Sequence, residues 1–417
     1  MGESAGIINR KSKKVRVSTQ LLIDVPLLIT IILLLVFGLL MLYSASWNYS
    51  LQAYDSGTYI LLRQVRWVLI GLAVMSVFTM LDYHKWQFLS LWFGLFVIAL
   101  LLFILVDFRN IGASTGYTRT LTTGGSIQPS EIAKVAVILY LASFLSNRKE
   151  FLNSFVQGTF PTLFVIGIPA GLVFFQPDIS AAITIAVIGG IMLFISGGNM
   201  KHLGVIVFLL AVAGAGGYFF YDKVGIRMQE YIAGIFNPTE ASYHIRRAYN
   251  AIINGGIFGV GIGKGTSKLT GLPFAWTDSI FAVILEETGL VGGIFVIGLY
   301  TCMLWRGYEI FKKAPDQFGK TLAAGITSWI FMEAALNICV MLNIMPFAGN
   351  ALPLISLGGT SMLCTMICLG ILLNISRVSA IENSMKGRNE PDAIVNLRGR
   401  DWGWRVSRPG STPGKNE

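Results

Sequence analysis

The chain has 417 residues, of which 54% are hydrophobic and only 13% charged. Soluble globular domains are about a quarter charged, so this composition excludes an ordinary soluble enzyme, and the high hydrophobicity excludes a disordered chain. The net charge of +10 comes largely from the tails and short loops, which membrane topology explains better than nucleic-acid binding does. A membrane crossing needs about 20 apolar residues, so the sequence predicts an all-α polytopic membrane protein.

Ten long apolar runs predict ten transmembrane helices. Their approximate ranges are 24–45, 65–82, 87–106, 130–147, 159–176, 180–198, 203–221, 280–305, 320–343 and 353–376. The first run lacks a small-residue cleavage site, which indicates a retained helix and not a signal peptide. Four cysteines fall inside apolar runs, where we expect small buried hydrophobes without a metal: Cys302, Cys339, Cys364 and Cys368.

Basic residues orient the predicted helices. An N-terminal tail, 1–23, carries five of them close together, and a C-terminal tail, 377–417, carries eight. An even number of crossings places both tails on one side, and the positive-inside rule makes that side cytoplasmic. The sequence therefore predicts a ten-helix domain over 24–376 between two cytoplasmic tails.

One connection is much longer than the others. Residues 222–279 form a predicted extracytoplasmic loop between helices seven and eight, and loops of this length are usually functional. Within it, Ile245, Tyr249 and Ile252 recur at helical spacing before Gly255, which predicts an amphipathic helix. This helix either covers the mouth of the bundle or contacts a ligand. The following segment 259–266 is rich in glycine but lacks the Ser or Thr of a phosphate-binding loop, so we expect a flexible turn.

Ionisable residues in apolar segments are costly in a bilayer, which makes them candidates for function. Glu131 and Lys134 share a face at the start of the fourth helix, either as a structural ion pair or as part of a binding site. Asp178 begins the sixth helix and Asp278 precedes the eighth, and each is either a helix cap or a functional carboxylate. Asp278 also lies at the predicted membrane–water boundary, where desolvation raises a carboxylate pKa toward that of a general base.

Deeper in the predicted bundle are Glu286, Glu287 and Glu333. We expect Glu333, one turn before Asn337, to make helix–helix hydrogen bonds. Neither a Ser/His/Asp set nor a His/Cys cluster can be argued, because the three histidines are scattered. From the residues alone, the sequence predicts an outward-facing site for an anionic lipid, with transfer chemistry and transport both open.

The candidate site residues divide by charge. Basic side chains suit an anionic head group such as a pyrophosphate, and carboxylates suit acid–base work or a divalent ion. The basic set is Arg63, Arg119 and Lys134, and the acidic set is Glu131, Asp178 and Asp278.

At these residues the chain resembles the SEDS family (shape, elongation, division and sporulation; the RodA/FtsW/SpoVE type). The resemblance spans roughly 25–376, and its motifs occur in order on the expected helices. They are Tyr43-Ser-Ala-Ser46, Arg63-Gln64, Gln128-Pro-Ser-Glu-Ile-Ala-Lys134, Gln176-Pro-Asp178, Gly255-Gly-Ile-Phe-Gly-Val-Gly-Ile-Gly263, Thr277-Asp278, Glu286-Glu-Thr-Gly-Leu290, Leu352-Pro-Leu-Ile-Ser-Leu-Gly-Gly-Thr360 and Asn374-Ile-Ser-Arg377.

The resemblance implies a peptidoglycan glycosyltransferase that polymerises lipid II into β-1,4 glycan strands at the outer face of the bacterial cytoplasmic membrane. Asp278 matches the family's catalytic aspartate and would act as general base on the acceptor 4-hydroxyl. Glu131, Lys134 and Asp178 match polar positions of the family's central cavity. A class B penicillin-binding protein, the transpeptidase that crosslinks the strands, is the implied partner. No cofactor is firmly implied, and a divalent cation, Mg²⁺ or Mn²⁺, near Asp278 stays open.

Some positions depart from the family pattern. Asp178-Ile-Ser-Ala181 stands where Asp-Leu-Gly-Thr is usual, Thr120 follows Arg119 where Trp is usual, and Ser279 replaces a usual Phe. These changes spare the ionisable positions but leave the elongation and division subtypes undistinguished. Two alternatives stay open: a lipid II flippase, and a non-catalytic scaffold for the penicillin-binding protein.

Overall fold

The structure, a computed structural model, describes residues 23–110, 128–152, 154–176, 178–220 and 222–386. These ranges contain helices and no strands. The helices are α1 (Val25–Tyr54), α2 (Tyr59–Met80), α3 (His84–Asn110), α4 (Pro129–Asn147), α5 (Phe160–Phe175), α6 (Ile179–Ile195), α7 (Met200–Phe220), α8 (Asp222–Phe236), α9 (Tyr243–Gly255), α10 (Ile280–Lys313), α11 (Gln317–Met341) and α12 (Gly359–Lys386).

The predicted class is confirmed. Each of the ten expected ranges overlaps a helix, namely α1–α7 and α10–α12. Within the described ranges, eight helices are long and apolar enough to cross a membrane. Helix α6 is apolar but shorter, at 17 residues, and α7 is an apolar helix of 21 residues. The protein is therefore a multi-pass membrane protein.

Several helix boundaries differ from the sequence prediction. Helix α1 continues nine residues past the predicted end at 45, because buried Ser46 and Ser50 lie on its inward face and lower the local apolarity without ending the helix. Helix α12 starts at Gly359 instead of 353 and continues to Lys386. Most of the two tails, residues 1–22 and 387–417, lies outside the described residues.

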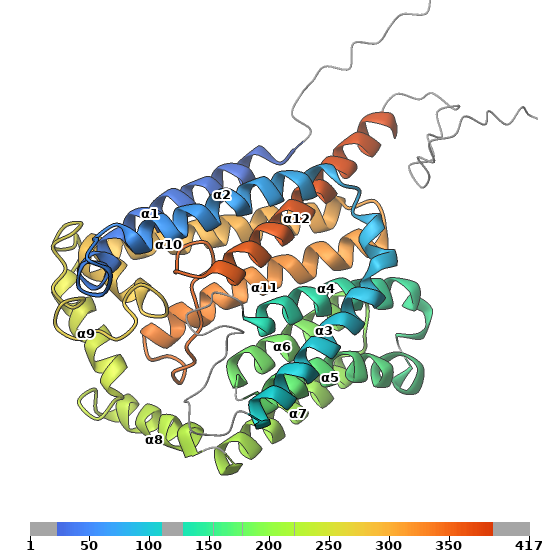
Figure 1. Ribbon diagram of the computed structural model, residues 1–417. Coiled ribbons are helices and arrows are strands. Elements are labelled where there is room, and N and C mark those ends of the chain that lie inside the picture. Colours follow the sequence, from blue (N-terminus) through green and yellow to red (C-terminus); the bar gives the residue numbers. More distant parts are fainter. Residues whose placement is uncertain (1–22, 111–127, 153, 177, 221, 387–417) are drawn as a thin grey trace, which may run out of the picture.

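The long helices run back and forth between two ends of an elongated bundle (Figure 1). Helices α8 and α9 lie at one end, which we call the α9 end, and the chain enters α1 and leaves α12 at the other. Helix α11 joins the two sides of the bundle, since it contacts α10 and α12 on one side and α4 and α6 on the other. This arrangement places the starts of α2, α4, α6, α10 and α12 together at the α9 end.

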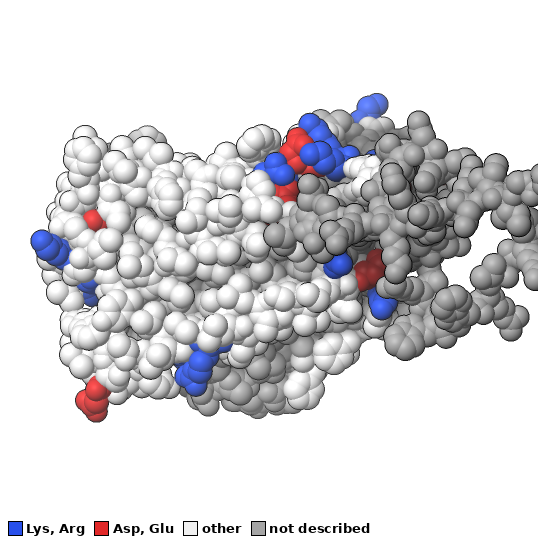
Figure 2. Space-filling model, turned by 90° about the horizontal axis from the view of Figure 1, so that it is seen from above, with Lys and Arg blue, Asp and Glu red and all other residues white. Residues whose placement is uncertain are grey.

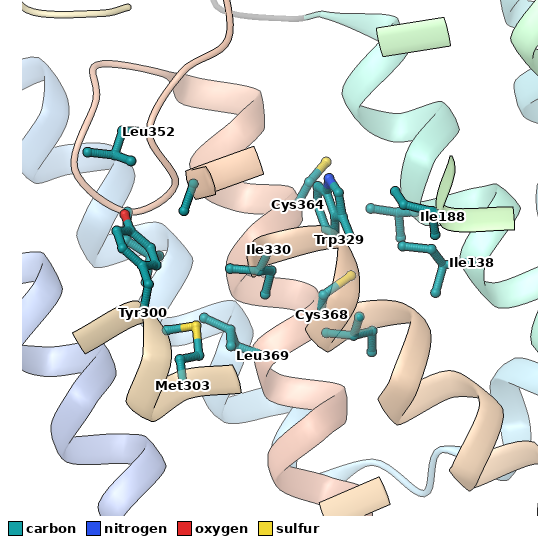
Figure 3. Packing of buried hydrophobic residues seen from close by; sticks show 14 of the residues in the cluster. Ile138, Ile188, Tyr300, Met303, Trp329, Ile330, Leu352, Cys364, Cys368 and Leu369 are labelled. Carbon is teal, nitrogen blue, oxygen red and sulfur yellow. The ribbon is translucent and has the colours of Figure 1, made fainter. Parts of the chain in front are cut away.

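The core around α11 is tightly packed and largely apolar (Figure 3). Trp329 of α11 is fully buried and faces Ile138 of α4 and Ile188 of α6. On the other side of α11, the prediction of buried cysteines is confirmed for Cys364 and Cys368, whereas the other two cysteines are only partly buried. Packing of this kind supplies helix association in a membrane, where the lipid is as apolar as the helix surfaces.

Charged residues avoid the middle of the molecule. In Figure 2 most coloured atoms lie near the two ends, and the surface between them is almost entirely white. Large apolar side chains such as Leu69, Phe96 and Phe208 are more than half exposed there. A band of exposed apolar surface between charged ends is what a bilayer-spanning bundle requires.

The predicted amphipathic helix is confirmed as α9. The hydroxyl of Ser242 caps it by accepting from the backbone N–H of Ile245 at 3.4 Å, and Ile245, Ala248 and Ala251 are buried against α10. Helix α8 was not predicted from the sequence. Its 15 residues are too few and too polar for a membrane span, and it ends before Pro238.

Helix α10 is interrupted at Gly289, whose φ of 69° lies in the left-handed region. The glycine-rich segment 256–261 fills the interruption, and the backbone N–H of Val260 donates to the carbonyl of Glu286 at 3.0 Å. A Cβ at position 289 would lie 2.3 Å from a carbonyl oxygen of this segment, so glycine is required. The backbone groups freed by a broken membrane helix are thus satisfied within the protein.

Two buried glutamates anchor the same loop. The Glu286 carboxylate accepts from the backbone N–H groups of Thr266 at 3.0 Å and Ser267 at 3.1 Å. The neighbouring Glu287 pairs with the ammonium of Lys268 at 2.6 Å and accepts from a hydroxyl of α1. Buried carboxylates need such partners, so the loop and the helix break stabilise one another. The predicted turn is confirmed in the segment 259–266, and its hydrogen bonds to Glu286 and Glu287 join it to α10.

Candidate functional site

A polar cavity of about 380 Å³ opens at the α9 end of the bundle. It lies among the starts of α2, α4 and α6, the late turns of α11, and the segments that precede α10 and α12. It is lined by Arg63, Trp67, Gln128, Glu131, Lys134, Asp178, Ser180, Ala181, Thr184, Phe274, Thr277, Asp278, Glu333, Gly349, Asn350, Ala351, Leu357, Gly358, Gly359 and Ser361. Five of the six predicted site residues meet here, although they are up to 215 positions apart in sequence (63 to 278).

An ion-pair triad forms one wall of the cavity. Lys134, only 3% exposed, pairs with Glu131 on its own helix at 2.7 Å and with Glu333 of α11. Lys134 also lies 5.5 Å from the ring centroid of Trp329. The helix–helix role expected for Glu333 is confirmed, but its partner is a lysine of α4 and not an amide.

The triad leaves one acceptor unused. The Oε2 atom of Glu131 is buried and has no hydrogen-bond partner within the described ranges. Because a buried, unsatisfied carboxylate oxygen is costly, it is suited to accept a hydrogen bond from a bound ligand.

Asp178 both caps α6 and lines the cavity, so the two predicted roles, helix cap and functional carboxylate, are compatible. One carboxylate oxygen accepts from the backbone N–H of Ala181 at 3.4 Å. The other accepts from the Gln128 amide at 3.1 Å and the Ser130 hydroxyl at 2.9 Å, both at the start of α4. These bonds join the first turns of α4 and α6 and hold the carboxylate in place.

Asp278 lies in the run of turns before α10 and is partly buried. Its main-chain carbonyl accepts from the Nδ2 of Asn337 at 2.8 Å, and the same amide donates to the carbonyl of Asn350 at 2.6 Å. A Cβ at Gly349 would lie 3.0 Å from an Asp278 carboxylate oxygen, so bare backbone borders the carboxylate there. Asp278 is not the residue that caps α10, since Ser279 occupies that position.

Arg63 lies within α2, which begins at Tyr59, six residues before the predicted start at 65. The chain enters the helix at Tyr59, because the segment 55–58 already completes the turn from α1. The neighbouring Gln64 donates to the carbonyl of Ser356 at 3.2 Å, which ties α2 to the segment before α12. Arg119 lies outside the described residues, so its place relative to the cavity stays a prediction.

The sequence analysis did not assign His244 to the site, although this residue contacts the segment that carries Asp278. The Nε2 of His244 hydrogen-bonds the Ser279 hydroxyl, which itself donates to the Pro273 carbonyl at 2.9 Å, so the histidine is the donor. Its ring centroid lies 4.3 Å from that of Phe347, two residues before the lining residue Gly349. Helix α9 thus contacts both the segment that carries Asp278 and the segment that carries Gly349.

Protonation of His244 should destabilise the protein at mildly acidic pH. Burial, and secondarily the charge of Arg227, lowers the pKa of His244 to about 4 from its ordinary 6.5. Between these values the unfolded chain binds a proton that the folded chain excludes, so stability falls as the pH drops through this window. We expect wild type to lose about 1 kcal/mol more than His244→Asn between pH 7 and pH 5, after allowance for solvent screening.

Thermal unfolding of the two purified proteins at both pH values measures this difference. The asparagine side chain keeps an N–H donor for Ser279 but does not titrate. Equal pH dependence in the two proteins would show that His244 is not excluded from protonation by the fold.

The donor set constrains any metal. Within the described ranges, no three His, Cys, Asp or Glu side chains form a group able to hold a metal ion. A Mg²⁺ ion is usually held by one or two carboxylates together with substrate phosphates. The cavity offers such carboxylates in Asp178 and Asp278. These two side chains would suit a cation that binds together with substrate phosphates.

Known proteins resemble this chain in sequence and in fold. The FtsW/RodA/SpoVE family of cell cycle proteins matches residues 25–381. A probable peptidoglycan glycosyltransferase FtsW from Geobacter sp. (strain M18) is 34% identical over 341 residues, which cover 80% of this chain and 91% of that protein. Stage V sporulation protein E of Bacillus subtilis (strain 168) is 33% identical over 340 residues, which cover 81% and 92%.

Solved structures share the helical arrangement. The rod shape determining protein RodA of Thermus thermophilus superposes with a TM-score of 0.63 at 24% identity, over 86% of this chain and 98% of that one. A chain of a peptidoglycan synthase complex that coordinates polymerization and crosslinking superposes with a TM-score of 0.70 at 23% identity, over 86% and 98%. The family match spans most of the chain, including the described residues that line the cavity. This chain therefore belongs to the FtsW/RodA/SpoVE family, the SEDS family that its motifs resemble.

Proposed function

We propose that this chain is a peptidoglycan glycosyltransferase that polymerises lipid II into β-1,4-linked glycan strands, with Asp278 as the general base. The observation that carries the proposal is the cavity at the α9 end. It gathers Asp278, Asp178 and the buried Lys134 ion pairs from four separate helical regions. Relatives that are a third identical over most of the chain are named as enzymes of this kind.

The reaction needs one base and one leaving group. The Asp278 carboxylate removes the proton of the acceptor 4-hydroxyl while that oxygen forms a bond to the anomeric carbon of the donor sugar. The bond from that carbon to the diphosphate oxygen breaks, and the polyprenyl diphosphate leaves with the electron pair. Attack from the opposite side converts an α linkage into a β linkage, so a single inverting displacement suffices.

The cavity must also stabilise the negative charge of the leaving diphosphate. Its lining contains two cationic side chains, Arg63 and Lys134, against four carboxylates. Lys134 is already shared between Glu131 and Glu333, so it holds the wall together and presents little net charge to a ligand. When bound, a Mg²⁺ or Mn²⁺ ion would neutralise the diphosphate, held by Asp178 or Asp278 together with the phosphate oxygens.

The orientation follows from the positive-inside rule. At the end where α1 begins, Arg306 donates to the carboxylate of Asp24 at 3.0 Å, and Lys312 and Lys313 complete the last turn of α10. We place this end in the cytoplasm, which puts both termini inside and the cavity at the outer face of the bacterial cytoplasmic membrane. Lipid-linked donor and growing strand would meet there.

A class B penicillin-binding protein is the proposed partner. Crosslinking acts on the strand that polymerisation makes, and a chain of the same fold occurs in a synthase complex that coordinates the two reactions. The large apolar side chains exposed along the spanning helices offer ample surface for the membrane helix of such a partner.

A polymerisation assay tests the proposal. The purified full-length chain, alone and with its cognate transpeptidase, would be mixed with labelled lipid II, and products resolved on a gel beside an active control polymerase. We expect a ladder of glycan products. Absence of products beside a working control would overturn the proposal. Transfer of labelled lipid II across liposome membranes would then favour a flippase. Restoration of transpeptidase activity without glycan products would favour a scaffold.

A further inference from the structure

The α9 end carries a second polar pocket, distinct from the cavity. It has a volume of about 360 Å³ and shares no lining residue with the cavity. Its walls are one face of α9 (helix labelled in Figure 1) and the turn at 266–270. It is lined by Arg247, Asn250, Ile253, Asn254, Thr266, Ser267 and Thr270. We call it the α9 pocket.

The helix wall of the α9 pocket presents unused hydrogen-bonding groups. Arg247, Asn250 and Asn254 are spaced by three and four residues, which places them on one face of α9. Within the described ranges, the amides of Asn250 and Asn254 make no side-chain hydrogen bond. Arg247 uses its Nε to contact the Tyr243 hydroxyl at 3.2 Å and stacks on that ring, which leaves its terminal nitrogens for a ligand.

The turn that forms the opposite wall is held in place by hydrogen bonds to α10. Thr266 and Ser267 donate their backbone N–H groups to the fully buried carboxylate of Glu286 in α10. The Thr270 hydroxyl donates to the Thr266 carbonyl at 3.2 Å, which closes the turn. Because both walls are fixed to α10, the backbone positions that carry the polar side chains are set before a ligand binds.

The α9 pocket is connected to the cavity through a short stretch of chain. Thr270 lines the pocket, and Phe274, four residues later, lines the cavity close to Asp278. Four residues span at most about 14 Å even when fully extended. The α9 pocket therefore lies within reach of a polymer that leaves the cavity near Phe274.

The lining predicts the chemistry of the ligand. Amide and hydroxyl groups match sugar hydroxyl and acetamido groups, the exposed side chain of Ile253 suits the apolar face of a sugar ring, and Arg247 is the single ionisable lining residue. A neutral or anionic saccharide therefore fits, and a cationic ligand does not. Of the residue types enriched at protein interfaces, the lining contains Arg247 but no aromatic residue or methionine.

We propose that the α9 pocket binds the glycan strand as it leaves the cavity, a role that rests on the proposed polymerase function. By holding the product near Asp278, the pocket would keep the strand attached between successive additions. Its loss would shorten the strands.

Binding can be measured without any reaction. The probe is a soluble tetramer of N-acetylglucosamine, titrated against the full-length protein in nanodiscs. We expect the Asn250→Ala/Asn254→Ala protein to bind it about tenfold more weakly than wild type, the equivalent of about 1.4 kcal/mol. Arg246→Gln, a change on the same helix outside the pocket, is the matched control for Arg247→Gln. Equal affinity in all these proteins, or no binding by wild type, would overturn the assignment.

Product length is the second readout. For equal amounts of lipid II consumed, we expect the double variant to make shorter strands than wild type and Arg246→Gln. An unchanged length distribution would overturn the role in strand retention. If wild type makes no polymer but binds the tetramer through Asn250 and Asn254, the polymerase proposal is overturned. The α9 pocket would then remain a saccharide-binding site. Variants that bind the tetramer normally but lose the transpeptidase would make the pocket a protein-docking surface.

Discussion

Asp278→Asn should lower the polymerisation rate by at least about 10²-fold, the usual contribution of a positioned general base. The amide has nearly the size of the carboxylate but does not accept a proton at neutral pH. The bond from Asn337 to the main-chain carbonyl of residue 278 does not involve the changed atoms, so the segment should keep its place. Gel-resolved glycan products from lipid II, timed for both proteins, measure the effect.

Asp55→Asn is the matched control for this substitution. Asp55 is exposed, ends α1 at the same end of the bundle, and adopts a φ of 53°, which asparagine also tolerates. We expect polymerisation and thermal stability close to wild type. If Asp278→Asn is as active as Asp55→Asn and equally monodisperse, Asp278 is not the base, and the cavity loses its assigned chemistry.

Lys134→Met should destabilise the fold by about 3–5 kcal/mol, the usual cost of leaving buried charges without their partner. Lys134 is the cation that joins Glu131 of α4 to Glu333 of α11, so its loss leaves two carboxylates close together in a buried wall. Thermal unfolding in detergent at neutral pH, followed by tryptophan fluorescence and by aggregation, measures the change.

Two further proteins separate charge from packing. Lys264→Met removes an exposed lysine from the glycine-rich segment and should leave stability unchanged. Adding Glu131→Gln and Glu333→Gln to Lys134→Met removes all three charges, and we expect this to restore much of the stability but not polymerisation. If Lys134→Met alone unfolds at the temperature of Lys264→Met, the triad does not hold the wall together.

The location of the cavity explains why its residues were recognisable in sequence. Glu131, Lys134, Asp178 and Asp278 are ionisable residues in or beside apolar runs, and a bilayer makes such residues costly unless they have partners. Their motifs matched those of a known family, which the comparisons confirm. The structure adds that Arg63 belongs to the same cavity from within α2.

Other features left no local signal. The contact of Glu333 with Lys134 joins residues 199 positions apart, and the bond of His244 to Ser279 depends on how α9 packs on α10. The glycine-rich segment read as a flexible turn because its partners, the backbone of the broken α10 and two glutamates, lie further along the chain. Helix α8 was not predicted because it is too short and too polar for a membrane span, although its apolar residues gather on one face.

The sequence by itself determined the membrane class, the places of the apolar helices and the amphipathic α9. These features depend on apolar run length and helical periodicity, which are properties of neighbouring residues. The tertiary structure alone decided which charges meet, where α10 breaks and which loop fills the break. In the bilayer the backbone groups freed by a helix break must find partners within the protein, and the packing of distant helices sets those partners.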